Sequence, residues 1–214
     1  MMMSRLLTIS TIVAAVLALP DATSKQIPAG CASYPSYNAD TGEAGVFLVK
    51  VVHSENPAIE GFSDTSDYSV GIGAQGRPYM RWGYLTIPSR NDIAKTGLKC
   101  SGGILRAWVD AELTAAGTPT NVQWAPLALS PYADGGVLLY KIEGDEVRVY
   151  EHYIEEEKQP GLFLGGYDDS ATWGLKYVAP HATDPDGNYQ MRLIRTTEAV
   201  GVNETRGLVK IEGF

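Results

Sequence analysis

Short runs of β-branched and aromatic residues recur along the chain, and each is closed by Gly, Pro, Asp or Asn. Examples are VFLVKVV at 46–52, YMRWGYLTI at 79–87 and WGLKYV at 173–178. Runs of four to eight residues with such punctuation predict β-strands separated by turns. About ten of them, with 23 glycines and 12 prolines, predict an all-β fold, a single-domain antiparallel sandwich or barrel.

The most pronounced local pattern lies at residues 137–153, VLLYKIEGDEVRVYEHY. Two β-rich runs flank a tight reversal, which predicts a β-hairpin. With Gly144 and Asp145 as a two-residue turn, Tyr140 would face Val149. The same register places two like-charged side chains opposite each other, so a bulged or longer turn remains an alternative.

Residues 104–116 are compatible with either a strand or a helix. Ala, Leu and Glu favour a helix ending at Ala116 with Gly117 as its cap. We favour the strand, because Gly102 and Gly103 offer no helix N-cap and the polar and apolar residues of 104–113 alternate with a period of two. In that pattern Leu105, Ala107, Val109, Ala111 and Leu113 share one face, and Ile104, Arg106, Trp108, Asp110 and Glu112 share the other.

The N-terminus has the pattern of a secretory signal peptide. One cationic residue, Arg5, precedes the uncharged run Leu6 to Leu19, and small residues before Ala18 suit a signal peptidase. We predict residues 1–18 as the signal peptide, with a cut after Ala22 as an alternative. A membrane anchor is the competing interpretation, but a spanning helix needs about 20 apolar residues.

The remaining chain shows no low-complexity linker and suits one domain. Residues 19–45 are predicted to be an irregular leader, and residues 46–214 the β-domain. The two cysteines, Cys31 and Cys100, predict a disulfide that ties the leader down, as expected in an oxidising compartment. Asn203 opens the only N-x-S/T sequon, which predicts a glycosylated surface loop.

Charge narrows the range of partners. The formal net charge is −8, and it becomes −9 when Arg5 leaves with the signal peptide. An acidic surface repels phosphate backbones, and no Lys/Arg cluster compensates. We therefore predict neither nucleic-acid binding nor binding to anionic membranes.

The histidines give no motif for catalysis or metal binding. His53, His152 and His181 are far apart in sequence, in no H-x-H or H-x-x-x-H arrangement, and no G-x-S-x-G occurs. A fold could still gather them for base catalysis or metal binding. A single histidine is more often a strand or loop residue, so we predict no catalytic residue, no metal and no cofactor.

Two further patterns favour turns over ligand sites. Residues 71–76 match G-x-G-x-x-G, but a strand-like run follows in place of the helix that a dinucleotide site needs. Residues 184–188, DPDGN, offer oxygens for calcium but lack the distal glutamate of an EF-hand loop. We predict a Gly-rich turn at the first and a turn joining two strands at the second.

Carboxylates and aromatic residues are the remaining candidates. Glycoside hydrolysis needs a pair of carboxylates, but the sequence spacing of the acidic residues does not identify which two would form it. The candidates are Asp168, Asp169, Glu151 and Glu112. Tyrosine and tryptophan can stack on sugar rings or fill a β-core. We favour core packing for each of Trp82, Trp108, Trp124 and Trp173, and exposed tyrosine clusters as the better candidate for a ligand surface.

Three C-terminal blocks carry a resemblance to a known group of proteins. WGLKYV at 173–178, YQMRLI at 189–194 and ETRGLVKI at 204–211 resemble the closing strands of small secreted fungal surface or cell-wall proteins. The resemblance implies an extracellular, non-catalytic β-protein at the cell wall or in the medium. It contains no catalytic residue to carry over.

Together these features predict a secreted non-catalytic protein, structural or ligand-binding, at a cell surface or wall. Its predicted partner is a cell-wall polysaccharide or a surface protein. One alternative is a secreted enzyme on a β-barrel, either a glycan-active hydrolase or a small-molecule cyclase or isomerase. Another is a secreted effector that binds a host protein. The sequence predicts no specific ligand and no strand order.

Overall fold

The computed structural model describes residues 22–70, 81–113, 119–130, 136–140, 144–180, 185–195 and 198–213. In this part of the chain most residues lie in strands, and the only helical segments are two 3-10 turns, η1 (Pro57–Ile59) and η2 (Tyr167–Asp169). The all-β prediction is confirmed, with sixteen strands in place of the ten or so predicted. No helix among the described residues is long and apolar enough to cross a membrane.

All sixteen strands belong to one antiparallel sheet. The strands are β1 (Ala22–Gln26), β2 (Tyr37–Asn38), β3 (Glu43–Val52), β4 (Thr65–Val70), β5 (Arg81–Pro88), β6 (Leu98–Ser101), β7 (Ile104–Leu113), β8 (Pro119–Leu129), β9 (Gly136–Tyr140), β10 (Asp145–Glu146), β11 (Arg148–Ile154), β12 (Glu157–Lys158), β13 (Leu162–Gly165), β14 (Thr172–Val178), β15 (Asn188–Leu193) and β16 (Glu204–Gly213).

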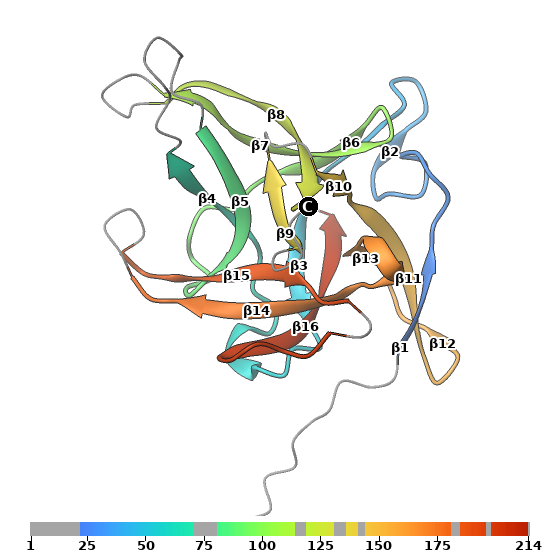
Figure 1. Ribbon diagram of the computed structural model, residues 1–214. Coiled ribbons are helices and arrows are strands. Elements are labelled where there is room, and N and C mark those ends of the chain that lie inside the picture. Colours follow the sequence, from blue (N-terminus) through green and yellow to red (C-terminus); the bar gives the residue numbers. More distant parts are fainter. Residues whose placement is uncertain are drawn as a thin grey trace, which may run out of the picture.

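The sheet folds over on itself into two layers. Of the two predicted architectures, sandwich and barrel, the structure therefore fits the sandwich. In Figure 1, β6, β7 and β8 lie above, and β14, β15 and β16 lie below. The strand order β16-β14-β15-β5-β9-β8-β7-β6-β3 connects the layers through β5 and β9. Strand β3 also pairs with β16 from Val52↔Leu208 to Phe47↔Gly213, which joins the layers along a second side.

The core lies between these layers and is made by the inward face of each strand. In β3 the burial alternates, so that Phe47, Val49 and Val51 are fully buried. Trp173 of β14 is also fully buried, and its indole N–H donates to the carbonyl of Leu164 at 2.8 Å. Burying a large apolar side chain stabilises the fold by about 1.5–3 kcal/mol.

The predicted hairpin at 137–153 is wrong. Strand β9 pairs with β5, β8 and β15, and β11 pairs with β1, β12 and β13. Tyr140 therefore faces Gly83 and Leu127, and Val149 faces Leu164. Each run pairs with other strands, some near in the chain and some distant, and those pairings replace the predicted one.

The strand predicted over residues 104–113 is confirmed, and β7 has these bounds. Leu105, Ala107 and Val109 are buried, whereas Ile104 and Trp108 are exposed. The period-two pattern therefore predicted correctly which of these side chains face the core and which face outward. The helix alternative, which extended to Ala116, is wrong for the described residues.

The leader is less irregular than predicted, because it contains β1 and β2 and the first residues of β3. The predicted disulfide is confirmed: Cys31 bonds to Cys100 of β6, with a Cα–Cα distance of 5.4 Å. It fixes the segment between β1 and β2 to the sheet. The predicted signal peptide, residues 1–18, and the G-x-G-x-x-G stretch at 71–76 lie outside the described residues.

Candidate functional site

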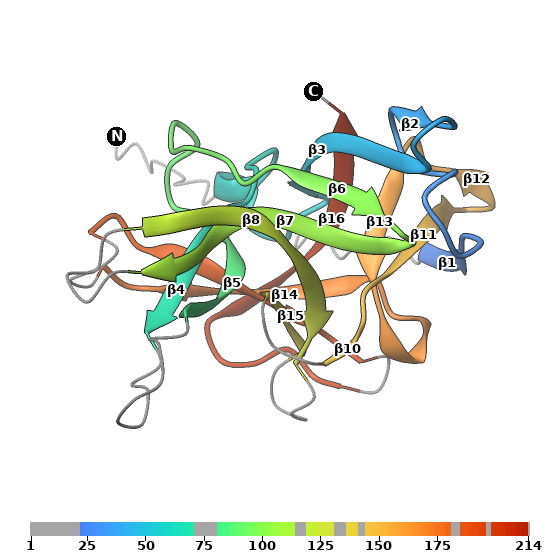
Figure 2. The ribbon, with the colours of Figure 1, turned by 90° about the horizontal axis from the view of Figure 1, so that it is seen from above.

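Two tryptophans stand together on the outer face of the upper layer. Trp108 of β7 and Trp124 of β8 are direct cross-strand partners, with ring centroids 5.2 Å apart and planes inclined by 52°. Trp108 is 47% exposed although its neighbours Ala107 and Val109 are buried. Strands β6, β7 and β8 run side by side on this face, which Figure 2 views from above.

Other large apolar side chains are exposed on the same strands and on the neighbouring β3. Ile104, Val122 and Val46 are each at least 40% exposed, and they lie on β7, β8 and β3. Contiguous exposed apolar surface on a soluble protein commonly marks an interaction site. The outer face of these strands is therefore the first candidate for ligand contact.

A β-bulge aims one of these side chains outward. Gly45 pairs with Lys99 and Phe47 pairs with Leu98, so Val46 is the extra residue between them. A bulge re-aims the side chain at its position, and Val46 is 44% exposed beside the fully buried Phe47. Gly45 has φ +122°, and a Cβ there would lie 2.9 Å from the Leu98 carbonyl oxygen. Only glycine suits this backbone.

Gly97 forms the floor between Val46 and the tryptophans. Its carbonyl accepts the Trp108 N–H at 2.8 Å. A Cβ at residue 97 would lie 3.0 Å from Val46 Cγ1 and 3.9 Å from the Trp124 ring. The missing side chain leaves a hollow of about 340 Å³, lined by Val46, Gly97, Trp108 and Trp124, which we call the tryptophan groove.

A second hollow of about 330 Å³ adjoins the groove and shares Val46 and Trp124 with it. We call this hollow the polar end, after its polar lining residues Ser36, Asn38, Thr41, Glu43 and Lys99. The Lys99 ammonium lies 3.0 and 3.1 Å from the two carboxylate oxygens of Glu43 and 5.0 Å from the centroid of the Trp124 ring. It therefore connects the carboxylate to the aromatic surface through an ion pair and a cation–π contact.

The carboxylate of Glu43 is held in its ionised form. The Ser101 hydroxyl donates to it at 2.6 Å. This bond and the one from Lys99 lower the pKa of Glu43, because both stabilise the charged form. The polar end thus presents a fixed acceptor next to an ammonium donor.

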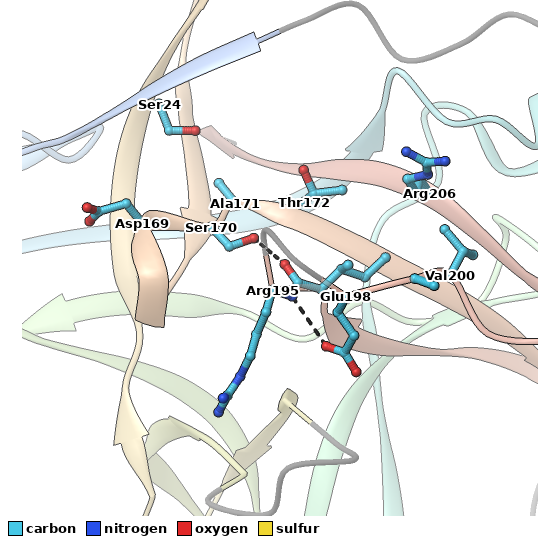
Figure 3. Close-up of a pocket in the computed structure, with 11 residues that line it drawn as sticks. Ser24, Asp169, Ser170, Ala171, Thr172, Arg195, Glu198, Val200 and Arg206 are labelled. Carbon is cyan, nitrogen blue, oxygen red and sulfur yellow. Dashed lines mark hydrogen bonds between the residues drawn. The ribbon is translucent and has the colours of Figure 1, made fainter.

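Figure 3 shows a separate polar pocket of about 520 Å³, which shares no lining residue with the groove or the polar end. Its lining comes from β1, from the turn between η2 and β14, from the segment after β15 and from β16. The residues are Ser24, Asp169, Ser170, Ala171, Thr172, Ile194, Arg195, Glu198, Ala199, Val200 and Arg206.

The polar groups of this pocket are largely bound to protein partners. The Ser170 hydroxyl donates to the Ile194 carbonyl, as the dashed line in Figure 3 shows. Glu198 forms an ion pair with Arg192 at 2.6 Å. Arg206 contacts Glu55 at 3.3 Å. These contacts hold the wall of the pocket in place.

His152 lies behind the polar pocket and is 1% exposed. Its Nε2 is 3.4 Å from the Ser24 hydroxyl oxygen, and its ring packs on Phe163 at a centroid distance of 4.4 Å. Burial, and then the nearby His53, lower the pKa of His152 to about 4, because both disfavour the charged imidazolium. Its Nδ1 has no hydrogen-bond partner among the described residues.

A second buried titratable group, Asp64, lies in the core next to β3. It is fully buried, and its Oδ1 accepts the Val49 N–H at 3.1 Å. Burial raises the pKa of Asp64 to about 7, although this hydrogen bond and the charge of Lys95 act in the opposite direction. Asp64 lines neither the tryptophan groove nor the polar pocket.

The structure does not gather the histidines named from the sequence into a catalytic group. His53 is exposed, with φ +52°, and its backbone N–H binds Glu60. His181 lies outside the described residues. Asp169 and Glu198 line the polar pocket, but His152 does not. In the described part of the chain, no three His, Cys, Asp or Glu residues are placed to hold a metal ion.

The other candidate carboxylates are dispersed. Glu151 pairs with Lys158 at 2.6 Å. Asp168 lies in η2 with φ +55°. The side chain of Glu112, like Asp184 of the DPDGN stretch, is outside the described residues. Asp186 of that stretch forms an ion pair with Arg90 at 3.2 Å, and β14 and β15 on either side of it are paired as the predicted turn requires.

Asn203 lies in an exposed turn before β16, with φ +60°. Thr205, two residues on, has its hydroxyl 3.4 Å from the Leu175 carbonyl oxygen. An exposed turn suits the predicted glycosylation, which stays a prediction.

The tryptophans divide between core and surface. Core packing is confirmed for Trp173 and is wrong for the exposed Trp108, while the side chain of Trp82 lies outside the described residues. The exposure of Trp108 could have been deduced from the sequence, because it alternates with Leu105, Ala107 and Val109. A tyrosine pair also exists: Tyr177 is 45% exposed and lies 5.2 Å from Tyr189, away from the tryptophan groove.

Comparison with known proteins adds no relative. No protein-family model matches the chain, and a search of curated proteins found no match.

Proposed function

We propose that this protein is a secreted, non-catalytic polysaccharide-binding protein of a cell surface or wall, with the tryptophan groove as its binding site. The observation that carries the proposal is the exposed indole of Trp108, which stands against the half-buried Trp124 on the outer sheet face. An exposed aromatic ring contributes less to the core than a buried ring would. A ligand that covers it accounts for its exposure.

A sugar ring matches this surface chemically. Its C–H groups form an apolar face that can stack on indole, and its hydroxyl edge needs hydrogen-bond partners. The tryptophan groove supplies the apolar surface, and the adjoining polar end supplies the Glu43 carboxylate and the Lys99 ammonium. Ligand sites commonly combine an apolar lining with a few placed polar groups.

The charge and the disulfide support the same proposal. A net charge of −8 disfavours polyanionic partners such as nucleic acids. The Cys31–Cys100 bond is of the kind that persists in oxidising, extracellular compartments. An uncharged polysaccharide outside the cell is compatible with both features.

The test is a pull-down of the signal-free protein with insoluble chitin, β-glucan and whole cell walls. We expect retention by at least one of them, and we expect Trp108→Ala to reduce it about tenfold or more, since loss of a central aromatic anchor typically costs over 1 kcal/mol. Tyr177→Ala is the matched control, because Tyr177 has nearly the same exposure and also belongs to an aromatic pair. The control should be retained like the wild type.

Retention that is equal in both variants would place the binding site elsewhere. Retention of the wild type by none of the polysaccharides would reject the proposal and would direct attention to the effector alternative.

The enzyme alternative has one supporting contact, between Ser24 at the polar pocket and His152. A hydroxyl next to an imidazole suits acyl transfer, so its test is release of acetate from acetylated chitin or β-glucan oligomers by the wild type, with loss of that activity in Ser24→Ala.

A further inference from the structure

Resting on the proposed function, we infer that the tryptophan groove and the polar end are two adjoining subsites for a linear, uncharged polysaccharide that runs across the strands. The first subsite stacks one sugar ring on the tryptophans. The second binds the hydroxyl groups of a neighbouring ring through Glu43 and Lys99.

The two hollows adjoin each other. Both are lined by Val46 and Trp124, so a ligand on Trp124 borders both at once. The lining runs from β8 through β7 and the start of β6 to β3, which are successive neighbours in the sheet. Three inter-strand spacings amount to about 14 Å. This length exceeds a single sugar ring.

The floor of the first subsite is kept open by the backbone. Gly97 leaves space that any side chain would occupy, since its Cβ would approach Val46 Cγ1 to 3.0 Å. The bulge at residues 45–47 turns Val46 outward to form one wall. Stacking requires such a flat, open approach to the tryptophan rings.

The second subsite favours an uncharged ligand. Glu43 and Lys99 are the charged residues among those that line the two hollows, and they neutralise each other at 3.0 Å. The carboxylate accepts hydrogen bonds and the ammonium donates them, which suits adjacent hydroxyl groups. An acidic sugar would have to compete with Glu43 for Lys99 and to approach a chain of net charge −8.

Calorimetric titration with β-glucan and chitin oligomers, from disaccharide to hexasaccharide, tests the inference. We expect wild-type affinity to rise about tenfold as the oligomer fills both subsites and then to level off, because the second ring adds hydrogen bonds. Glu43→Gln keeps the size of the side chain but removes its charge, and it should abolish most of this gain. Gly97→Ala should weaken all lengths alike, because the added methyl group raises the floor.

The outcomes separate the two proposals. If the wild type binds no uncharged oligomer, the proposed function itself fails. If it binds them with an affinity that is independent of length, or keeps its length gain in Glu43→Gln, the two-subsite inference is overturned while the proposed function stands. Equal or tighter binding of polygalacturonic acid oligomers would overturn the preference for uncharged chains. Thermal unfolding of each variant confirms that it is folded.

Discussion

The tryptophan groove and the polar pocket differ in how their side chains are used. The pocket is the larger, at about 520 Å³ against about 340 Å³, but contacts within the protein occupy its polar groups: Ser170 binds the Ile194 carbonyl and Glu198 binds Arg192. The groove is smaller, and the Trp108 ring in it remains exposed while Trp124 is half-buried. We therefore favour the groove, with its uncovered aromatic surface, over the larger pocket as the ligand site.

The two regions also differ in what a substitution should disturb. A side chain that is bound within the fold contributes to stability, whereas an exposed ring contributes mainly to ligand contact. Changes in the polar pocket should lower the free energy of unfolding and leave polysaccharide binding intact. Changes in the groove should have the opposite effect.

The disulfide is the one feature that serves both regions, so its removal should have the largest effect on stability. The segment around Cys31 carries Ser24 of the polar pocket and Asn38 of the polar end. Cys31 and Cys100 are 69 residues apart, and replacing both with serine should lower the free energy of unfolding by about 4 kcal/mol. Urea unfolding measures the loss. Wild type kept in reductant should show the same loss, and an unchanged free energy would contradict the prediction.

The next largest effect should come from the ion pair behind the polar pocket. The Glu204 side chain is 3% exposed. It binds Arg192 at 3.0 and 2.7 Å and accepts the Gly201 N–H at 2.7 Å. Glu204→Ala leaves the largely buried guanidinium without this partner and should cost about 3 kcal/mol.

Lys158→Ala is the control for that variant, because it breaks an exposed pair with Glu151 and should cost less than about 1 kcal/mol. Polysaccharide retention should be unchanged in both variants. Reduced retention in a folded Glu204→Ala protein would show that the two regions are coupled.

Two buried titratable groups, His152 in contact with Ser24 of the polar pocket and Asp64 in the core next to β3, should respond to pH in opposite directions. His152 has a folded pKa of about 4, below its ordinary value of 6.5, so its contribution to stability is complete above pH 6.5 and is lost as the pH falls through 4. Asp64 has a folded pKa of about 7, above its ordinary value of 3.8. Its contribution is complete below pH 3.8 and is lost as the pH rises through 7.

Between about pH 4 and 6.5 these two contributions offset each other in the wild type. Asp64→Asn keeps an acceptor for the Val49 N–H but does not titrate. Only the His152 contribution then remains, so the free energy of unfolding of this variant should rise by about 3 kcal/mol as the pH rises across this range. His152→Gln should instead lose stability by a similar amount as the pH rises. Urea midpoints measured against pH test both variants. Parallel pH profiles in the two variants would refute the assignment.

The sequence predicted individual strands well, and β14 and β15 pair as its predicted turn requires, but its pairing of the two runs at 137–153 is wrong. The alternation at 104–113 correctly assigned the bounds of β7 and the inner and outer faces of its described side chains, because burial on one face imposes a period of two on any strand. The hairpin at 137–153 failed because local β-propensity does not specify a partner. Strand β9 pairs with the preceding β8 and with the distant β5 and β15. Strand β11 pairs with β12 and β13, which follow it, and with the distant β1.

The groove could not be predicted for the same reason. Its lining residues come from three separate stretches, at Val46, at Gly97 and at the β7–β8 pair, and only the strand order brings them together. Trp108 was predictable as an outward side chain, but its ring neighbours were not. The glycine floor and the bulge depend on close approaches of the backbone, which composition does not reveal.

The clearest contrast with Glu204→Ala is expected from Trp108→Ala, which should change stability little and binding strongly. Removing an exposed ring from a cross-strand aromatic pair should cost only about 1 kcal/mol of stability, while polysaccharide affinity should fall about tenfold or more. Urea unfolding and calorimetric titration on the same preparation compare the two quantities directly. A loss of stability as large as that of Glu204→Ala, with affinity retained, would mean that the ring is part of the core and that the groove is not the binding site.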